Sequence, residues 1–277
     1  MKEFFHRMRK FGSLDVAAGI CAGLLLACTA LAVVKTPAVE SRLRAVKNNI
    51  TAPARAARVA PRLADFRGGQ ASEDVRFIAN WVADSRDAGD RPFVIIDKKG
   101  ARVYVFDGGA RLLGAAPVLL GVAPGDDTVP GIGDRPLSQV LMHERTTPAG
   151  RFVGERGHNA RGEDVVWVDY DAAVSMHRVL TTNKQERRLE RLATPTVDDN
   201  RVSFGCINVP VAFYERFLRP TFADQTAMIY VLPEVKSIRQ VFAAYDVAAR
   251  YGLNRAQAQR APDSDALMIL LFALRSS

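Results

Sequence analysis

Short apolar runs separated by turn residues fill the middle of the chain, and this pattern is typical of a mainly β domain. Two such runs, Pro92–Asp97 and Ala101–Asp107, flank Lys98-Lys99-Gly100, and this arrangement predicts a β-hairpin. The other runs that we expect to be extended are Arg111–Val122, Arg151–Val153, Asp164–Asp169, Ala172–His177 and Ala227–Leu232. Their order predicts a β core over about residues 90–233, with helices at its ends.

Several other segments carry helical patterns. Ser72–Ser85 begins with Ser-Glu-Asp and spaces its apolar residues three or four positions apart, which predicts a short amphipathic helix. Lys184–Leu192 predicts a charged helix, and Val209–Phe217 predicts an amphipathic one. Val235–Tyr251 has a continuous apolar face and predicts a single long helix. The last apolar run, Ala266–Leu274, is too short to span a bilayer and is expected to pack on the domain.

The N-terminal region contains a much longer apolar run. From Leu14 to Val34 the chain has 21 residues and one charge, Asp15. About 20 apolar residues cross the roughly 30 Å hydrocarbon core of a bilayer, so this run predicts a transmembrane helix. Lys and Arg residues are equally numerous on its two sides, and their distribution therefore does not set the orientation. Ala30-Leu31-Ala32 resembles a signal-peptidase site, which leaves a cleaved signal peptide as the alternative to an uncleaved anchor.

The net charge of +8 is concentrated near the N-terminus. Residues 1–67 hold 12 basic and four acidic residues, and residues 68–277 hold 26 of each. A nucleic-acid-binding fold carries its Lys and Arg on the folded body, so nucleic acid is not an expected partner. The basic segment either lies on anionic headgroups or is a solvated spacer.

These patterns divide the chain into four parts. Residues 1–35 are the predicted membrane anchor, and residues 36–88 are a basic linker with a short helix. Residues 89–234 form a domain of catalytic size, and residues 235–277 form a C-terminal helical extension.

Cysteine and histidine usage limits the chemistry. Cys206 is separated from Cys21 and Cys28, which lie in the apolar N-terminal run, so the folded part has no pair for a disulfide. No metal site is expected because the four histidines do not cluster in the sequence: His6, His143, His158 and His177. No other cofactor is expected either. The isolated thiol of Cys206 is then either an inert buried side chain or a nucleophile.

The residues around Cys206 bear on that choice. Gly205 permits a left-handed backbone just before the thiol. Asn208 is a good N-cap for the helix predicted to run toward Phe217, and a helix N-terminus close to Cys206 would favour the thiolate. His177, at the end of a predicted strand, is the candidate base.

The order Ser-x-Gly-Cys-hydrophobic-Asn at residues 203–208, preceded by a strand-terminal His, resembles the catalytic domain of the L,D-transpeptidases of the YkuD type. Phe93–Phe106 is similar to the opening hairpin of that family. Thr147–Phe152 is similar to its Thr-Pro-x-Gly-x-Phe segment, and Ala227–Leu232 is similar to its closing strand. The resemblance covers about residues 90–233, or half of the chain.

The resemblance implies a sandwich-like or barrel-like β core with flanking helices, and an enzyme that acts on the stem peptides of peptidoglycan. Cys206 would attack a tetrapeptide stem, and His177 would be its base, oriented by a backbone carbonyl just after it. The N–H groups around Gly205 and Cys206 would hold the oxyanion, and Ser203 would have a structural role in the loop. The acyl group would pass to an amine for cell-wall crosslinking. Water, a free D-amino acid or a protein amine are alternative acceptors, and water would make the enzyme an L,D-carboxypeptidase.

Two residues depart from the family pattern. Phe204 replaces the usual second His of the motif, and Arg178 follows His177 where a small residue is common. The interval from His177 to Ser203 is also longer than usual, with Lys184–Leu192 as the insertion. An inactive, membrane-anchored peptidoglycan-binding module is therefore an alternative.

The implied location is the inner membrane, with a single span and the catalytic domain in the periplasm. Secretion to the periplasm after signal cleavage is the alternative, and a cytosolic Cys hydrolase would require residues 14–34 to be core. The sequence predicts no oligomeric state.

Overall fold

The structure is a computed structural model, and it describes residues 60–259. The predicted transmembrane run Leu14–Val34 and the apolar run Ala266–Leu274 lie outside the described residues. One compact unit begins at Pro61 and contains the whole β core. Between residues 60 and 259, no helix combines the length and the apolar character that a membrane span requires.

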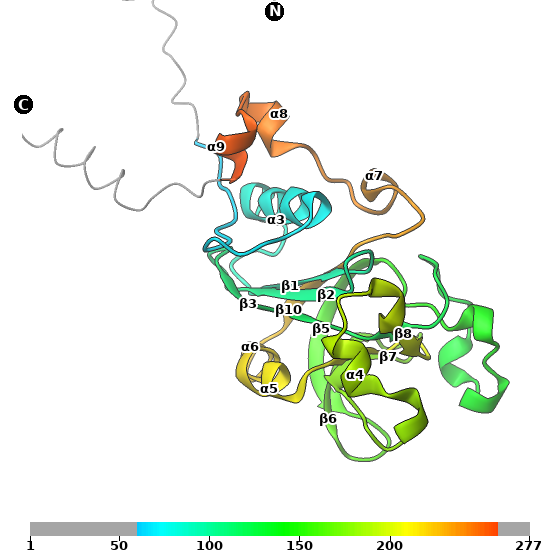
Figure 1. The fold of residues 1–277 in the computed structure, drawn as a ribbon. Coiled ribbons are helices and arrows are strands. Elements are labelled where there is room, and N and C mark those ends of the chain that lie inside the picture. Colours follow the sequence, from blue (N-terminus) through cyan, green and yellow to red (C-terminus); the bar gives the residue numbers. More distant parts are fainter. Residues whose placement is uncertain (1–59, 260–277) are drawn as a thin grey trace, which may run out of the picture. The chain divides into compact units, whose positions relative to one another are not determined.

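Eight strands form one sheet in the order β3-β2-β1-β10-β5-β6-β7-β9 (Figure 1). Their bounds are β1 Phe93–Asp97, β2 Arg102–Phe106, β3 Leu112–Pro117, β5 Gly150–His158, β6 Asp164–Asp169, β7 Val174–Arg178, β9 Ile207–Val209 and β10 Ala227–Val231. Two short strands, β4 (Leu120–Gly121) and β8 (Arg201–Ser203), pair separately. A bridge between Leu119 and Asn208 links β9, at one end of the sheet, to the residues that follow β3 at the other. The sheet is therefore nearly closed, and the predicted mainly β core is confirmed.

The helices are short except for one. They are α3 Glu73–Ser85, α4 Arg188–Ala193, α5 Val211–Phe213, α6 Arg219–Thr221, α7 Ile238–Val241, α8 Val247–Tyr251 and α9 Arg255–Gln259. A π-helical turn, η6 (Tyr214–Leu218), joins α5 to α6 in one continuous helical segment. The 3₁₀ turns are η1 Ile132–Asp134, η2 Leu137–Gln139, η3 Met142–Glu144, η4 Lys184–Glu186 and η5 Val197–Asn200.

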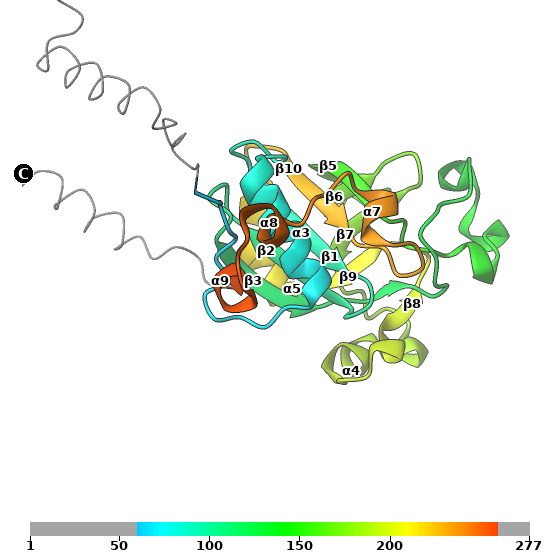
Figure 2. The ribbon, with the colours of Figure 1, turned by 90° about the horizontal axis from the view of Figure 1, so that it is seen from above.

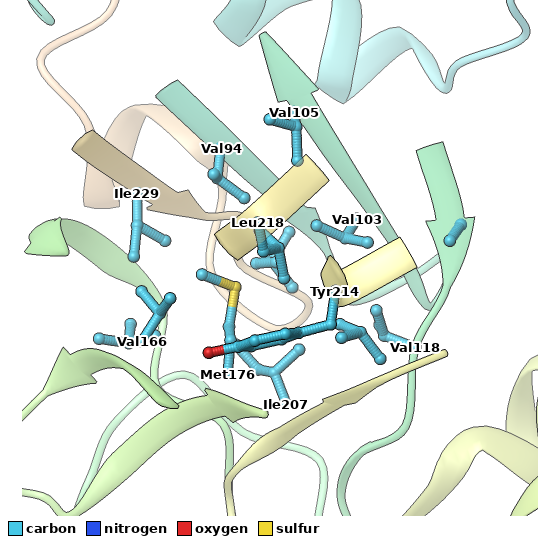
Figure 3. Close-up of a cluster of buried hydrophobic side chains, with 14 of the residues drawn as sticks. Val94, Val103, Val105, Val118, Val166, Met176, Ile207, Tyr214, Leu218 and Ile229 are labelled. Carbon is cyan, nitrogen blue, oxygen red and sulfur yellow. The ribbon is translucent and has the colours of Figure 1, made fainter. Parts of the chain in front are cut away.

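Both faces of strands β1, β2 and β10 are covered, which explains why all five residues of β1 are buried. Side chains alternate between the two faces of a strand. Val94 and Ile96 enter the cluster that contains Tyr214 of the α5–α6 segment (Figure 3). Phe93 and Ile95 enter a second cluster with α3, which lies over β1 and β2 on the opposite face (Figure 2).

Helix α3 is confirmed with its predicted start. Ser72 is the N-cap, and its Oγ accepts a hydrogen bond from the N–H of Val75 at 3.3 Å. The buried face of α3 packs on the sheet, with Trp81 edge-on to Tyr230 at 6.2 Å between ring centroids. Phe66, ahead of the helix, is 5% exposed and belongs to the same cluster. Residues 61–88, which the sequence pattern placed in the linker, therefore belong to the folded body.

The single helix predicted over Val235–Tyr251 is wrong. The chain forms α7 and α8, and Phe242 between them is extended, with φ −120° and ψ 138°. This break lets Phe242 turn inward, where it is 3% exposed and 6.1 Å from the ring of Tyr230. Asp246 then starts α8 as an N-cap, because its Oδ1 accepts from the N–H of Ala249 at 3.1 Å. Burial of one aromatic side chain, worth roughly 1.5–3 kcal/mol, outweighs the local helical pattern.

The helix predicted over Lys184–Leu192 is also interrupted. Arg187 has a positive φ of 48°, and it separates the turn η4 from helix α4. The two pieces stand beside β8 (Figures 1 and 2).

A buried ion pair anchors the long excursion between β4 and β5 to the sheet. Lys98, from the turn of the first hairpin, is 0% exposed, and its Nζ lies 2.7 Å from Asp126 Oδ1. The same Nζ donates to the carbonyls of Gly125 (2.6 Å) and Thr147 (2.9 Å). Asp126 in turn accepts the N–H groups of residues 234, 235 and 236. The two ends of the excursion are therefore tied to the sheet and to the segment after β10.

Candidate functional site

Strands β7 and β9 bring the candidate residues together. They are parallel neighbours, with Met176 opposite Ile207 and His177 opposite Asn208. Ser175 and His177 share one face of β7, because alternate residues of a strand point to the same side. Met176 points the other way, into the core. Cys206 immediately precedes β9 and therefore lies beside Ser175 and His177.

The thiol of Cys206 is half-buried and free. Its Sγ is 3.7 Å from Ser175 Oγ and 3.6 Å from the carbonyl oxygen of Ala173. Ala173 has a positive φ of 53°, in the turn that precedes β7. One wall of the thiol's environment is thus the β6–β7 turn together with the first residues of β7.

His177 shares a face of β7 with Ser175, beside the thiol, and its presence lowers the pKa of Cys206. Its Nδ1 is 2.8 Å from the carbonyl oxygen of Arg178. A carbonyl only accepts, so this bond assigns the ring proton to Nδ1 and leaves Nε2 of the neutral ring as an acceptor. The backbone carbonyl after His177 is the contact that the sequence resemblance implied.

The surroundings of Cys206 favour its thiolate. Burial raises the pKa of the thiol, but the hydrogen bond and charge of His177 and the hydrogen bonds of Ser175 lower it further than burial raises it. The pKa of Cys206 is therefore below its ordinary value. A lowered pKa gives a larger thiolate fraction at neutral pH, which a nucleophilic cysteine requires.

Gly205 is required at its position for two reasons. Its φ is +133°, a region that side chains with a Cβ rarely adopt. A Cβ there would also lie 2.7 Å from the backbone oxygen of Thr146. The hydroxyl of Thr147 donates to the Gly205 carbonyl at 2.8 Å and accepts from the N–H of Gly121 at 2.9 Å. Thr147, in the Thr-Pro segment noted in the sequence, thus links the Cys206 loop to Gly121 through these two hydrogen bonds.

Ser203 closes the loop internally. Its Oγ donates to the carbonyl of Cys206 at 2.6 Å and accepts from the N–H of Gly205 at 3.1 Å. Ser203 is 3% exposed, which agrees with a structural part in the loop. The N–H of Gly205 is occupied by this bond and is therefore not free to bind an oxyanion. Of the two N–H groups expected to hold the oxyanion, that of Cys206 remains.

The expected capping by Asn208 is wrong. Asn208 lies within β9 and exchanges two backbone hydrogen bonds with Leu119, each of 2.9 Å. Helix α5 begins only after Pro210 and has no side-chain cap. The whole of β9 separates Cys206 from that helix, so a helix N-terminus is not what stabilises the thiolate.

Asn208 instead connects the loop to the insertion. Its side chain is fully buried, donates to the Cys206 carbonyl at 3.3 Å and accepts from Arg188 Nη1 at 2.6 Å. Arg188 belongs to α4 and is held by Glu186 at 2.5 Å. The insertion between His177 and Ser203 therefore contributes a residue to the support of the cysteine loop.

Phe204 occupies the position of the usual second His. Its ring is 37% exposed, and the guanidinium carbon of Arg145 lies 3.8 Å from the ring centroid. Arg145 Nε and Nη2 both donate to the Val140 carbonyl, at 3.2 and 3.0 Å. An apolar ring under an arginine thus replaces an imidazole beside Cys206.

Arg178 points its side chain into a separate ion-pair network. Its guanidinium binds Asp164 at 2.8 Å and Glu215 at 2.6 Å, and it stacks over Tyr214 at 4.1 Å. These bonds lower the pKa of both carboxyl groups. Arg178 and His177 share the lining of a pocket of about 400 Å³. Arg178 differs from the family pattern in its side chain, which binds Asp164 and Glu215. Its backbone carbonyl still contacts Nδ1 of His177.

Sequence reasoning missed several of these residues. Ser175 could have been found, because it precedes His177 by two positions in the same predicted strand. Arg145 and Arg188 have no local signal, since they reach the loop from distant parts of the chain. In the described part of the chain, no group of three or more His, Cys, Asp or Glu side chains is arranged to hold a metal ion.

The fold and the residues describe a mainly β domain in which a free cysteine just before β9 lies beside a histidine of the neighbouring strand β7. Solved structures similar to this chain include the helical cell shape determining protein Pgp2 from Campylobacter jejuni, at 17% identity and a TM-score of 0.36 over 53% of this chain and 49% of that one. They also include the L,D-transpeptidase LdtMt1 in complex with imipenem, at 17% identity and a TM-score of 0.29 over 51% and 58% of the two chains. An L,D-transpeptidase from Mycobacterium smegmatis gives 15% identity and a TM-score of 0.29 over the same shares.

L,D-transpeptidases, the family that the Cys206 motif resembles, are thus among the structural neighbours. No protein-family model and no curated protein matches the chain. The chain spans about half to three fifths of the length of these neighbours.

Proposed function

We propose that this protein is a peptidoglycan L,D-transpeptidase that uses Cys206 as its nucleophile. The observation that carries the proposal is the arrangement of three groups: the Cys206 thiol, the His177 ring on the neighbouring strand, which lowers the pKa of the thiol, and the Arg178 carbonyl 2.8 Å from Nδ1 of that ring. This is the arrangement that activates a thiol for acyl transfer.

The proposed reaction has two halves. His177 Nε2 takes the thiol proton, and the thiolate attacks the carbonyl that joins a terminal D-amino acid to the stem peptide. The N–H of Cys206 donates to the oxygen that becomes negatively charged. The C–N bond then breaks, His177 returns the proton to the leaving amine, and a thioester remains on Cys206. An amine of a second stem attacks the thioester, loses a proton to His177 and releases the thiol.

Ser175 has a supporting part in this scheme. Its hydroxyl is 3.7 Å from Sγ and can donate to the thiolate, but a serine hydroxyl cannot serve as the base. Ser175 is therefore a positioning residue that stabilises the charged form of Cys206.

The acceptor distinguishes two candidate activities of one site. Water in place of the second amine gives an L,D-carboxypeptidase with the same acyl-enzyme.

A substrate outside the cytoplasmic membrane also requires the domain to be exported. We therefore infer that Leu14–Val34 is a membrane span or a signal peptide, and that the folded body lies in the periplasm. The apolar character of that run supports this placement.

The test is formation of the acyl-enzyme by the full chain. Imipenem, present in the LdtMt1 structure, is a suitable probe because a β-lactam acylates an activated nucleophile. We expect one imipenem mass to be added to the wild type in an intact mass spectrum, and none to Cys206→Ala. His177→Ala is expected to slow acylation about 10²- to 10⁴-fold. The matched control His158→Ala removes an exposed histidine at the end of β5 and is expected to react like the wild type.

A tetrapeptide donor then tests the reaction itself. Release of the terminal D-amino acid, with a crosslinked dimer as product, supports transpeptidation, and release with a free tripeptide supports carboxypeptidation. A wild type that neither reacts with imipenem nor releases the D-amino acid would contradict the proposal and favour an inactive binding module.

A further inference from the structure

Arg145 lies beside the Cys206 loop and has no anionic partner among the residues that the structure describes. Within residues 60–259, its hydrogen bonds are those of Nε and Nη2 to the neutral Val140 carbonyl, and no carboxylate is within ion-pair distance. Nη1 donates to no group of the described chain. The other two arginines tied to the site are satisfied: Arg178 by Asp164 and Glu215, and Arg188 by Glu186.

Two contacts fix where this unpaired charge stands. The guanidinium carbon is 3.8 Å from the centroid of Phe204, two residues before Cys206. The next residue, Thr146, presents its carbonyl so close to Gly205 that a Cβ there would lie 2.7 Å away. Both the side chain and the following backbone of Arg145 are thus packed against the loop that carries the thiol.

Phe204 holds the guanidinium without neutralising it. An aromatic face attracts a cation but leaves its N–H edge free to bind an anion in the plane. The Val140 carbonyl occupies one edge, so the remaining edge is the one that can receive a ligand. A planar guanidinium with a free edge matches a carboxylate in charge and shape.

We propose that Arg145, supported on the ring of Phe204, is a specificity residue that binds a carboxylate of the donor peptide. The inference rests on the proposed function, because a peptide that ends in a D-amino acid carries its terminal carboxylate one residue from the carbonyl that Cys206 attacks. A carboxylate elsewhere along the stem is the second source of the same chemistry. The replacement of the motif His by Phe204 then has a consequence: the site gains a cation platform in place of an imidazole.

The experiment compares three synthetic tetrapeptide donors with the full-length enzyme. One has all its carboxylates free, one has a C-terminal amide, and one has the internal carboxylates amidated and the C-terminus free. Release of the terminal residue gives kcat and KM for each. Charge-assisted hydrogen bonds are worth about 1.5–3 kcal/mol, so we expect the wild type to prefer the recognised carboxylate roughly 10- to 100-fold in kcat/KM. The arm that loses this preference identifies which carboxylate is bound.

Arg145→Gln is expected to remove the preference by raising KM for the donors that carry the recognised carboxylate. Its kcat/KM for the donor in which that carboxylate is amidated should stay within about twofold of wild type. Arg145→Lys should retain part of the preference, because it keeps the charge but loses the planar fork. Phe204→Leu should weaken the preference, since the cation loses its platform. Arg161→Gln, an equal charge change on the exposed β5–β6 turn, is the matched control and should keep the wild-type preference.

Failure of the inference and failure of the proposed function give different results. A wild type that processes all three donors equally well overturns the inference and leaves the transpeptidase proposal standing. An equal loss on all three donors in Arg145→Gln, with slower alkylation of Cys206 by neutral iodoacetamide, assigns Arg145 a structural part and also overturns the inference. A wild type that processes no donor contradicts the proposed function, and the inference falls with it.

Discussion

The support of the Cys206 loop predicts a large and specific cost for Gly205→Ala. Gly205 has φ +133°, and an added Cβ would lie 2.7 Å from the Thr146 carbonyl oxygen. A strained backbone costs about 1–3 kcal/mol, and forcing an extra methyl into a packed site costs about 1–3 kcal/mol more. We therefore expect Gly205→Ala to lower the free energy of unfolding by roughly 2–6 kcal/mol.

The matched control separates the two contributions. Gly162 has φ +79° in the β5–β6 turn, and nothing lies within 4 Å of the position that a Cβ would take. Gly162→Ala therefore carries backbone strain alone, about 1–2 kcal/mol. The excess cost of Gly205→Ala measures the close approach of the loop to Thr146. Because the obstructing atom belongs to the backbone, shortening the Thr146 side chain by Thr146→Ala is not expected to rescue the variant.

Thermal and urea unfolding of the full chain, followed by circular dichroism, measure both variants. For a folded body of this size, each kcal/mol lowers Tm by roughly 2–4 °C, so a cost of roughly 2–6 kcal/mol should make Gly205→Ala melt about 4–24 °C below wild type. Iodoacetamide alkylation reports on the site in the same samples, since displacing residue 205 moves the thiol away from His177. Equal costs for Gly205→Ala and Gly162→Ala would refute the close-approach reasoning, as would full rescue by Thr146→Ala.

Three further outcomes follow from the charges and from the proposed location. Removing His177 by His177→Ala raises the pKa of Cys206, so the midpoint of its iodoacetamide alkylation moves to higher pH; an unchanged midpoint would show that the ring does not stabilise the thiolate. Burial raises the pKa of Asp126, but the bond from Lys98 and those from the N–H groups of Lys236 and Glu234 lower it to about 2. This depressed pKa contributes roughly 2 kcal/mol to the free energy of unfolding, present above about pH 4 and lost as the pH falls toward 2. Acid unfolding of Asp126→Asn should lack this pH-dependent loss, and an acid profile identical to that of the wild type would contradict the reasoning. Alkaline phosphatase fused after Ser277 should be active in cells, whereas activity of a cytoplasm-only reporter at that point would remove peptidoglycan as the substrate.

Local patterns were sufficient for several strands and for the first helix, but β5 was predicted at only three of its nine residues and β8 and β9 were not predicted as strands. Alternating apolar residues and turn residues act over a few positions, so the hairpin of β1 and β2, strand β6 and the closing strand β10 were placed within a residue or two. Ser72 was identifiable as an N-cap because capping depends on neighbouring residues. Cys206 and His177 were singled out because their motif and their place at a strand end are also local features.

Only the tertiary structure decided how those elements are supported. Lys98 appeared to be a turn residue, but it is fully buried because Asp126 and the Thr147 carbonyl reach it from 28 and 49 residues away. The helical pattern of Val235–Tyr251 gave way to the burial of Phe242, which depends on the position of Tyr230. Such contacts join segments that are distant in the sequence, so patterns of neighbouring residues do not predict them.

The site divides in the same way. The sequence alone was enough to select the candidate pair Cys206 and His177 and the glycine before the thiol, since each belongs to one strand or one loop. The tertiary structure decided what surrounds them: Ser175 beside the thiol, Arg188 on Asn208, and Arg145 on the ring of Phe204. Reactivity depends on the identity of a side chain, which the sequence states directly. Orientation, pKa and charge at the site depend on groups brought together by the pairing of β7 with β9 and by the packing of the β4–β5 excursion, and only the folded chain creates that proximity.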